Sequence, residues 1–216
     1  MELRDLESLV KGRRSIRQWK KDEVPEELLR KAVEVATWAP NGGNFQGWHY
    51  VVIKNRGVIA KMADAVQSVA DKIASWPEGA SWGEDLKRYQ KNASFFRSAP
   101  TIVGVFAIEY QSPLDKVLVA RESTDNEARQ ILGFRRSAQT AIQSAAAAVT
   151  TMCLVFHQMG LGAVWLVSPL QAKKEIEAIL KAPPNRSLVC LVAVGYPDES
   201  PQKDRKPVDE VTDFIR

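Results

Sequence analysis

The stretch from residue 137 to residue 172 contains no Asp, Glu, Lys or Arg, and this feature most limits how the chain can fold. A membrane-spanning helix needs about 20 consecutive, predominantly apolar residues. Polar side chains such as Gln139 and His157 recur through the stretch, and Gly160 and Gly162 interrupt it, so we expect no such window. We therefore predict a buried helix, then a glycine turn, then a buried strand.

The hydrophobic pattern of the remaining chain predicts strands separated by helices. We expect a long central helix over 132–159, whose alanines at 145–148 would let another helix approach closely. No Pro-, Gly- or Ser-rich linker divides the chain, so residues 1–216 are predicted to form a single domain of the α+β class. The other predicted helices cover 1–11, 25–39 and 173–181, part of 56–91 and part of 111–130, and the predicted strands cover 48–53, 101–107, 163–167 and 188–194.

The composition argues against a nucleic-acid-binding face, a disulfide-stabilised fold and a secreted protein. The 30 basic and 26 acidic residues give a net charge of +4, and the acids are interspersed, so a broad nucleic-acid-binding face is not implied. Two cysteines do not make a disulfide framework. The first ten residues include acids where a secretory signal needs a basic start, so we expect a cytoplasmic protein.

Several catalytic and binding motifs are missing from the sequence. It contains no Walker sequence and no Gly-x-Ser-x-Gly elbow. The segment from Gly160 resembles the start of a dinucleotide-binding fingerprint, but Trp165 stands where the third glycine is required. A helix-ending turn is the better interpretation of these glycines.

The sequence also contains few side chains that could act as nucleophiles or metal ligands. His49 and His157 are the only histidines, and neither has a Cys or carboxylate at ligand spacing, so we expect no metal site. Cys153 and Cys190 lie in apolar segments and are predicted to be inert core thiols. If the chain is an enzyme, a bound organic cofactor would have to supply the chemistry.

Three polar clusters are candidates for binding. Arg13-Arg14-Ser15-Ile16-Arg17 follows Gly12, the expected cap of the first helix, and could hold a phosphate by charge-assisted hydrogen bonds. Pro40-Asn-Gly-Gly-Asn44-Phe-Gln46 offers amide groups and bare backbone to a planar ring. Lys203-Asp204-Arg205-Lys206 adds cations near the end of the chain. Taken singly, the first two clusters are more typical of a solvated basic turn and a plain Asn/Gly turn than of a binding site, and the third is typical of an exposed charged tail.

Taken together and in order, the clusters resemble the flavin-dependent nitroreductase family. The resemblance continues through Met159-Gly-Leu-Gly-Ala-Val-Trp-Leu and through Val194-Gly-Tyr-Pro followed by Lys203-x-Arg205-Lys-Pro-Val. It covers the first 55 and last 80 residues, whereas 56–130 match little. It implies a nitroreductase-like fold, with a central mixed β-sheet flanked by helices in an intertwined homodimer.

The resemblance also implies noncovalent FMN at the dimer interface, with NADH or NADPH as the electron donor. Arg13, Ser15, Lys203 and Arg205 would hold the phosphate, Arg14 would contribute through its backbone, and Arg17 would lie near the N1/O2 edge of the flavin. Pro40, Asn41, Gly42 and Asn44 of the partner chain would cover the ring, Gln46 would support that loop, and Val167 and Ser168 would place backbone near N5. No side chain is assigned a catalytic role, because flavin N5 carries the chemistry.

The function so implied is ping-pong transfer of hydride from NAD(P)H, through the flavin, to a small acceptor such as a nitroaromatic or quinone. Reductive dehalogenation, or oxygen-dependent breakdown of the flavin, would use the same fold and depend on lid residues within 56–130. A basic nucleic-acid-binding module using residues 11–21 is the alternative from another class, and it predicts a colourless protein.

Overall fold

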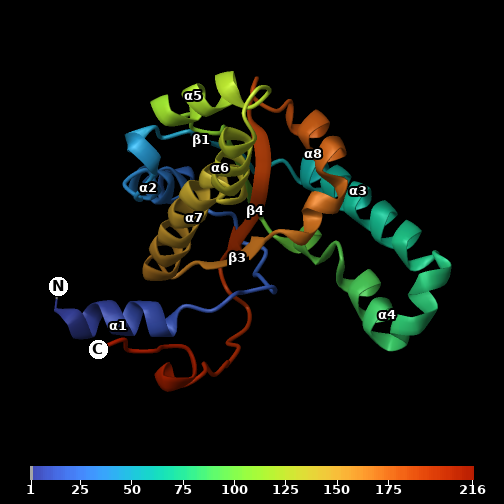
Figure 1. Cartoon of the computed structure of the whole chain (residues 1–216). Coiled ribbons are helices and arrows are strands. Elements are labelled where there is room, and N and C mark those ends of the chain that lie inside the picture. The colour runs from blue at the N-terminus through green and yellow to red at the C-terminus, as the bar shows by residue number, and fades with distance from the viewer. Residues whose placement is uncertain (1) are drawn as a thin grey trace.

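A computed structural model describes residues 2–216 (Figure 1). Its centre is a four-stranded sheet in the order β1-β2-β4-β3. Every pair of neighbouring strands is antiparallel. We expected a mixed sheet, but among the described residues the parallel pairing is limited to one isolated bridge, between Ser15 and Ala163. The strands are β1 Trp48–Ile53, β2 Thr101–Ala107, β3 Gly162–Leu166 and β4 Ser187–Gly195.

The predicted strands are confirmed to within one residue at each end, and helices surround them. Short 3-10 turns, η1 to η5, cover Gly42–Asn44, Pro77–Trp82, Phe95–Ser98, Ser168–Ala172 and Val208–Glu210. The α-helices are α1 Leu3–Gly12, α2 Glu26–Ala36, α3 Arg56–Ala74, α4 Gly83–Asn92, α5 Pro113–Arg121, α6 Asn126–Ser137, α7 Thr140–Gln158 and α8 Lys173–Leu180.

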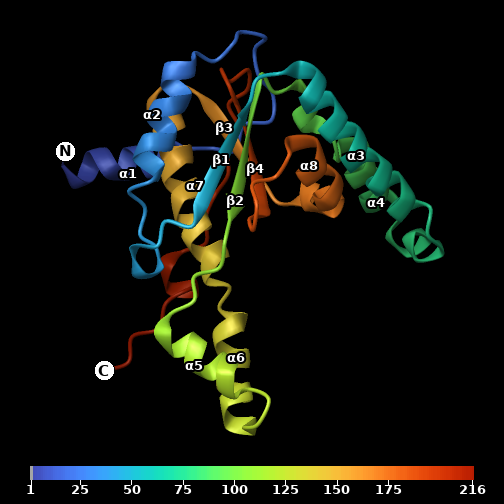
Figure 2. The same ribbon diagram turned by 90° about the horizontal axis from the view of Figure 1, so that it is seen from above.

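The sheet lies between two helical layers, as the edge-on view in Figure 2 shows. Side chains alternate between the faces of a strand, and β2 does so here: Val103 and Val105 pack toward α2 and α7, whereas Ile102 and Phe106 pack toward α3 and α8. Both faces of the sheet are therefore buried, which explains why its strands are almost continuously apolar.

The prediction of one continuous helix over 132–159 is wrong, because this stretch is divided into two helices, α6 and α7, at Gln139. Gln139 adopts a left-handed conformation with φ 48°, which few residues other than glycine adopt readily. The break redirects α6 away from the body, so that α5 and α6 project from it as a hairpin (Figure 2). Hydrophobic periodicity continues across this residue, and therefore it gave no sign of the break.

The expectation that no window could span a membrane also needs correction. Within Asn126–Gln158, one window of 18 residues reaches a mean hydropathy of 1.3, long and apolar enough to cross a membrane by length and composition alone. Core helices of globular proteins pass the same test. Helix α7 is such a core helix, because Val149, Met152 and Phe156 are buried beneath the sheet.

A second hairpin, formed by α3 and α4, projects from the side of the sheet away from α7 (Figure 2). Its outer helix is fastened to the segment that follows β3. The Tyr89 hydroxyl donates to Oε1 of Gln171 at 2.7 Å, and Gln171 Nε2 donates to the Val66 carbonyl at 2.9 Å. The position of α4 is therefore coupled to η4, the turn that contains Ser168.

Candidate functional site

The segment from Gly12 to Lys20, here called the basic arm, lies along the outer edge of β3. The Ile16 amide donates to the Ala163 carbonyl at 3.1 Å, and Trp19 Nε1 donates to the Gly162 carbonyl at 2.9 Å. Trp19 is 8% exposed and stacks on Phe95 with the ring centroids 6.3 Å apart. These contacts hold the arm in one extended path, although it contains no regular element.

The far end of the chain fastens the arm from its other side. The Gln18 amide donates to Oε1 of Glu199 at 3.1 Å, and the Arg17 amide donates to the same oxygen. The Lys20 amide donates to the Tyr196 carbonyl, and the Asp198 amide donates to the Gln18 carbonyl, both at 3.0 Å. The segment after β4 and the arm thus form one layer, which sequence spacing alone does not reveal.

Beneath this layer lies a cavity of about 240 Å³, which the arm, the end of α7, the glycine turn and the Pro197–Pro201 segment line together. Arg13 and Arg14 both line it. Arg14 Nη1 donates to the Lys11 and Arg13 carbonyls at 2.5 and 2.9 Å. Arg14 Nε is buried, and among the described residues it has no hydrogen-bond partner. A buried donor without an acceptor costs free energy, which an anion bound here would offset.

His157 from α7 lines the same cavity. Its pKa is lowered, first because the ring is partly desolvated and then because Arg13 and Arg14 are nearby. A β-carbon on Gly12 would lie 3.1 Å from His157 Nε2. Gly12 is the last residue of α1 rather than its cap, and its small size leaves room for this ring.

The glycine turn between α7 and β3 confirms the helix-ending interpretation. Gly160 has φ +75°, and the Leu161 amide donates back to the Phe156 carbonyl at 2.8 Å, which closes α7. A β-carbon on Gly162 would lie 2.7 Å from Ile16, so the glycine allows the arm to approach the strand. These glycines therefore form part of the cavity wall and do not form a dinucleotide-binding motif.

Lys203 and Arg205, the predicted phosphate ligands from the end of the chain, are exposed. Arg205 Nη1 donates to the Asp204 carbonyl at 3.0 Å. Among the described residues, Arg13 lines the cavity, but Lys203 and Arg205 do not. The structure thus brings together the arm and Glu199, but it leaves these two cations outside the cavity.

The loop from Pro40 to Gly47, here called the amide loop, is folded by its own side chains. Asn41 Oδ1 accepts from the Gln46 amide at 2.9 Å, and Gln46 Nε2 donates to Asn44 Oδ1 at 3.3 Å. Gly43, Asn44 and Gln46 all have positive φ. The loop therefore exposes polar backbone in a fixed shape, with Pro40, Gly42, Asn44 and Gln46 exposed and Asn41 half-buried.

Within one chain the amide loop and the basic arm lie apart. The loop runs into β1, whose Trp48 pairs with Ala107 at one end of β2. The arm pairs with Ala163, which aligns through Val194 with Thr101 at the other end of β2. The amide loop and the basic arm thus lie at opposite ends and opposite edges of the sheet. Val167 and Ser168 are exposed just after the end of β3.

The two cysteines have the character that the sequence predicted. Both are buried and free. Burial raises the pKa of Cys153 to about 11 and that of Cys190 to about 12, so both thiols stay protonated at neutral pH. Across residues 2–216, no three His, Cys, Asp or Glu side chains are grouped so that they could hold a metal ion. The site offers cations, amides and backbone groups, which bind and orient a ligand.

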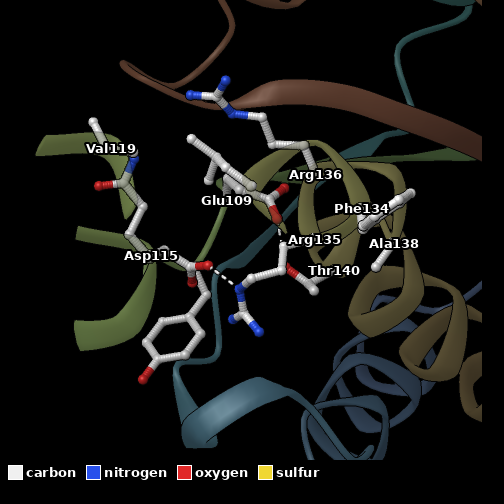
Figure 3. Close-up of a pocket in the computed structure, with 11 residues that line it drawn as sticks. Glu109, Asp115, Val119, Phe134, Arg135, Arg136, Ala138 and Thr140 are labelled. Atoms are coloured by element: carbon white, nitrogen blue, oxygen red, sulfur yellow. Dashed lines mark hydrogen bonds and ion pairs between the residues drawn. The ribbon is translucent and has the colours of Figure 1, made fainter. Parts of the chain in front are cut away.

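A cavity that sequence reasoning missed lies between α5, α6 and the start of α7 (Figure 3). Its volume is about 380 Å³, and Arg135 is paired there with Asp115. The Asp115 pKa is held below its ordinary value by hydrogen bonds from Arg135 and then Ser112. Thr140 donates to Glu109 across the same cavity. The pattern Ser112-x-x-Asp115 is a capping-box signal that would have located the start of α5.

Comparison with known proteins identifies the class of protein to which this chain belongs. The chain belongs to the nitroreductase family, whose model matches residues 10–196. This family consists of oxidoreductases, and its fold is the α+β arrangement described above. The predicted family and fold are thereby confirmed.

Three relatives show the range of the family around this chain. A BluB-like flavoprotein from Clostridium difficile 630 is 30% identical, with a TM-score of 0.83 and full coverage of both chains. The iodotyrosine deiodinase of Hydra vulgaris is 27% identical over 94% of this chain and 70% of its own length. The FMN-dependent nitroreductase NfnB of Mycobacterium smegmatis, solved with NADPH, shares 21% identity and a TM-score of 0.70, covering 99% of each chain.

Proposed function

We propose that residues 1–216 form a single FMN-binding domain that transfers hydride from NADH or NADPH to a small acceptor, such as a nitroaromatic or a quinone. Bound FMN would supply the redox chemistry. The observation that carries the proposal is the cavity under the basic arm, where Arg13 and Arg14 converge and the buried Arg14 Nε awaits an acceptor. A phosphate fits this donor set, because it presents several acceptor oxygens and a charge near −2.

The basic arm would bind the phosphate with Arg13 and Ser15. Arg14 would contribute through its backbone, as the resemblance implies, and would add its unpaired side-chain Nε donor. Lys203 and Arg205 would join them once the exposed tail closes over the bound cofactor. Arg17 is exposed beside this group, and it would place a fixed positive charge at the N1/O2 edge of the flavin ring. A fixed charge that needs no reorganisation is the most effective kind of electrostatic stabilisation.

A homodimer is part of the proposal, because the amide loop cannot reach the arm of its own chain. In a dimer, Pro40, Asn41, Gly42 and Asn44 of one protomer would cover the ring held by the other, with Gln46 bracing that loop through Asn44. Val167 and Ser168, which are exposed, would place backbone near flavin N5. We take the cytoplasm as the location, because its reducing environment suits two free cysteines.

Reductive dehalogenation is the second candidate, and the likeness to the Hydra deiodinase favours it. The α3–α4 hairpin would decide between the two functions. It is fastened to η4 beside Ser168 through Tyr89 and Gln171, so it could fold over the acceptor. The 30% identity with a BluB-like flavoprotein supports a flavin site. Oxygen-dependent breakdown of the flavin is a further reaction that the same fold could perform.

The test begins with the purified protein, which should be yellow and should release FMN on heating. Recovery of FAD, or a colourless protein that takes up no FMN, would contradict the proposal. Sedimentation should show a dimer of 24.1 kDa chains. Turnover of a nitroaromatic, a quinone and a halotyrosine with NADH or NADPH then separates the candidate reactions, whereas loss of FMN absorbance in air would indicate flavin breakdown.

Two arginine variants separate cofactor binding from chemistry. Arg205→Ala should weaken FMN binding by about 10- to 150-fold, because a charge-assisted hydrogen bond contributes about 1.5–3 kcal/mol. Arg17→Ala should instead lower the reduction potential of the bound FMN and slow its reduction by nicotinamide. Stopped-flow reduction and potentiometry of both FMN-saturated variants make the comparison. An unchanged potential in Arg17→Ala would place Arg17 away from the ring.

A further inference from the structure

A second basic cavity, of about 330 Å³, lies at the end of β1, beyond the basic arm. Four cationic side chains line it, together with Ser98, Pro100 and a single carboxylate, Glu23. The cations come from two separate segments, Lys20 and Lys21 at the end of the arm and Lys54 and Arg56 around the start of α3. Neither the family resemblance nor the proposed flavin site uses any of these residues.

The walls of this cavity are held by the fold. Lys20 is fixed through its backbone amide, which donates to the Tyr196 carbonyl at 3.0 Å, and the neighbouring Trp19 is buried against Phe95. Arg56 Nη1 donates to the Ala99 and Ser98 carbonyls, which orients its guanidinium toward the cavity wall. The fold therefore brings these cations together even when no ligand is bound.

Their charges are poorly compensated. Lys54 Nζ lies 3.5 Å from Oε2 of Glu23, a carboxylate whose side chain is 86% exposed. Among the residues that the structure describes, no ion pair engages Lys20 or Lys21. Helix α3 also directs its positive end here, although Asn55 Oδ1 already accepts from the Gly57 and Val58 amides. Side-chain ammonium and guanidinium groups are therefore the donors left for a ligand.

We propose that this cavity, defined by Lys20, Lys21, Lys54 and Arg56, binds the diphosphate group of a small phosphorylated molecule. A diphosphate suits it because its oxygens are spread over two phosphorus atoms and can meet cations from both segments at once. Its concave shape suits a compact anion better than a nucleic-acid backbone, which needs an extended basic stripe. The site is separate from the cavity beneath Arg13 and Arg14.

The test uses the FMN-saturated protein, so that the flavin site is filled, and titrates it with inorganic pyrophosphate by calorimetry at low ionic strength. The double variant Lys20→Gln/Lys21→Gln should bind pyrophosphate about tenfold more weakly. Glu23→Gln should bind it several-fold more tightly, because the one carboxylate is neutralised. The matched control Lys173→Gln/Lys174→Gln removes an adjacent lysine pair on α8 and should bind as the wild type does.

Melting temperature and FMN content should be unchanged in all variants, which separates binding from folding. A parallel titration with NAD⁺ and NADP⁺, which cannot reduce the flavin, identifies the source of the diphosphate, since a nicotinamide dinucleotide bound here should lose affinity in the same variants. The proposal is overturned if pyrophosphate binds only when FMN is absent, or if the control pair loses as much affinity as the Lys20/Lys21 pair. Preferential binding of duplex DNA in place of pyrophosphate would also overturn it.

Discussion

The basic arm and the amide loop are both irregular segments, yet they are held in opposite ways. The arm is positioned by residues far along the chain, with Arg17 and Glu199 separated by 182 positions. The loop is positioned by itself, since its Asn41–Gln46 hydrogen bond spans 5 positions. Damage to a distant element should therefore disturb the arm and spare the loop, whereas the loop should respond to changes within its own few residues.

The largest expected effect breaks the anchorage of the arm. Trp19→Ala removes a buried ring together with its hydrogen bond to the Gly162 carbonyl, and it should lower the free energy of unfolding by about 3–5 kcal/mol. Urea denaturation measures the loss. Trp38→Ala is the control, because that ring is 86% exposed. Equal losses in the two variants would mean that the arm is not held through Trp19.

A smaller effect tests the loop from within. Gly43→Ala must adopt φ +59° and place its β-carbon 2.9 Å from Tyr110, so it should cost about 1–2 kcal/mol. Gly42→Ala is a close control, because its β-carbon would meet Tyr110 at an ordinary 3.6 Å. Thermal unfolding of both variants makes the comparison. If Gly43→Ala is as stable as Gly42→Ala, the loop is not fixed in the left-handed conformation.

Removal of the carboxylate that holds the arm should have a still smaller effect on stability. Glu199→Ala deletes the acceptor for the Arg17 and Gln18 amides and should cost about 1 kcal/mol, because those amides can turn to water. It should nevertheless weaken FMN binding, since the arm loses its fixed path. Asp198→Ala, in which the backbone contact with Gln18 is kept, should retain FMN binding. A fluorescence titration with FMN distinguishes the two variants.

The smallest effect is a dependence on pH. The pKa of His157 is lowered in the folded chain, from an ordinary value of about 6.5. The unfolded chain therefore binds a proton more readily, and stability falls as the pH drops below about 6.5. Arg13, Arg14, Cys153 and Glu199 line the cavity around His157, and the two arginines dominate its charge.

His157→Gln should remove this part of the pH dependence, so that the variant loses less melting temperature than the wild type between pH 7 and pH 5. His49→Gln, at an exposed position on β1, should keep the wild-type dependence. Parallel slopes for wild type and His157→Gln would show that the histidine does not titrate against the arginine pair.

The contrast between arm and loop also explains what the sequence could predict. The β1 strand was located to the residue, because a run such as Trp48–Ile53 carries its own signal. The Asn and Gly residues of the amide loop likewise indicated a turn, because their conformations are local. The path of the arm could not be predicted, because it depends on Ala163 and Glu199, whose positions only the complete sheet determines.

The break at Gln139 was missed for a related reason. Nothing in the composition of residues 132–159 forbids a continuous helix, and the residue at the break is not a glycine or a proline. The tertiary position of the α5–α6 hairpin overrides the local preference there. The sequence likewise does not predict the convergence of Lys20, Lys21, Lys54 and Arg56, because the end of the arm and the end of β1 must meet before these charges become neighbours.

The attachment of the arm to β3 has a consequence for the order in which the molecule folds. Contacts between residues far apart in sequence form late, because the chain must first lose the entropy of closing a long loop. The bridge between Ser15 and Ala163 should therefore form late, and the contact of Glu199 with the arm should form only once the chain has reached the end of β4. A growing chain thus carries its arginines from the beginning, but the proposed phosphate site is complete only when its last strand is in place.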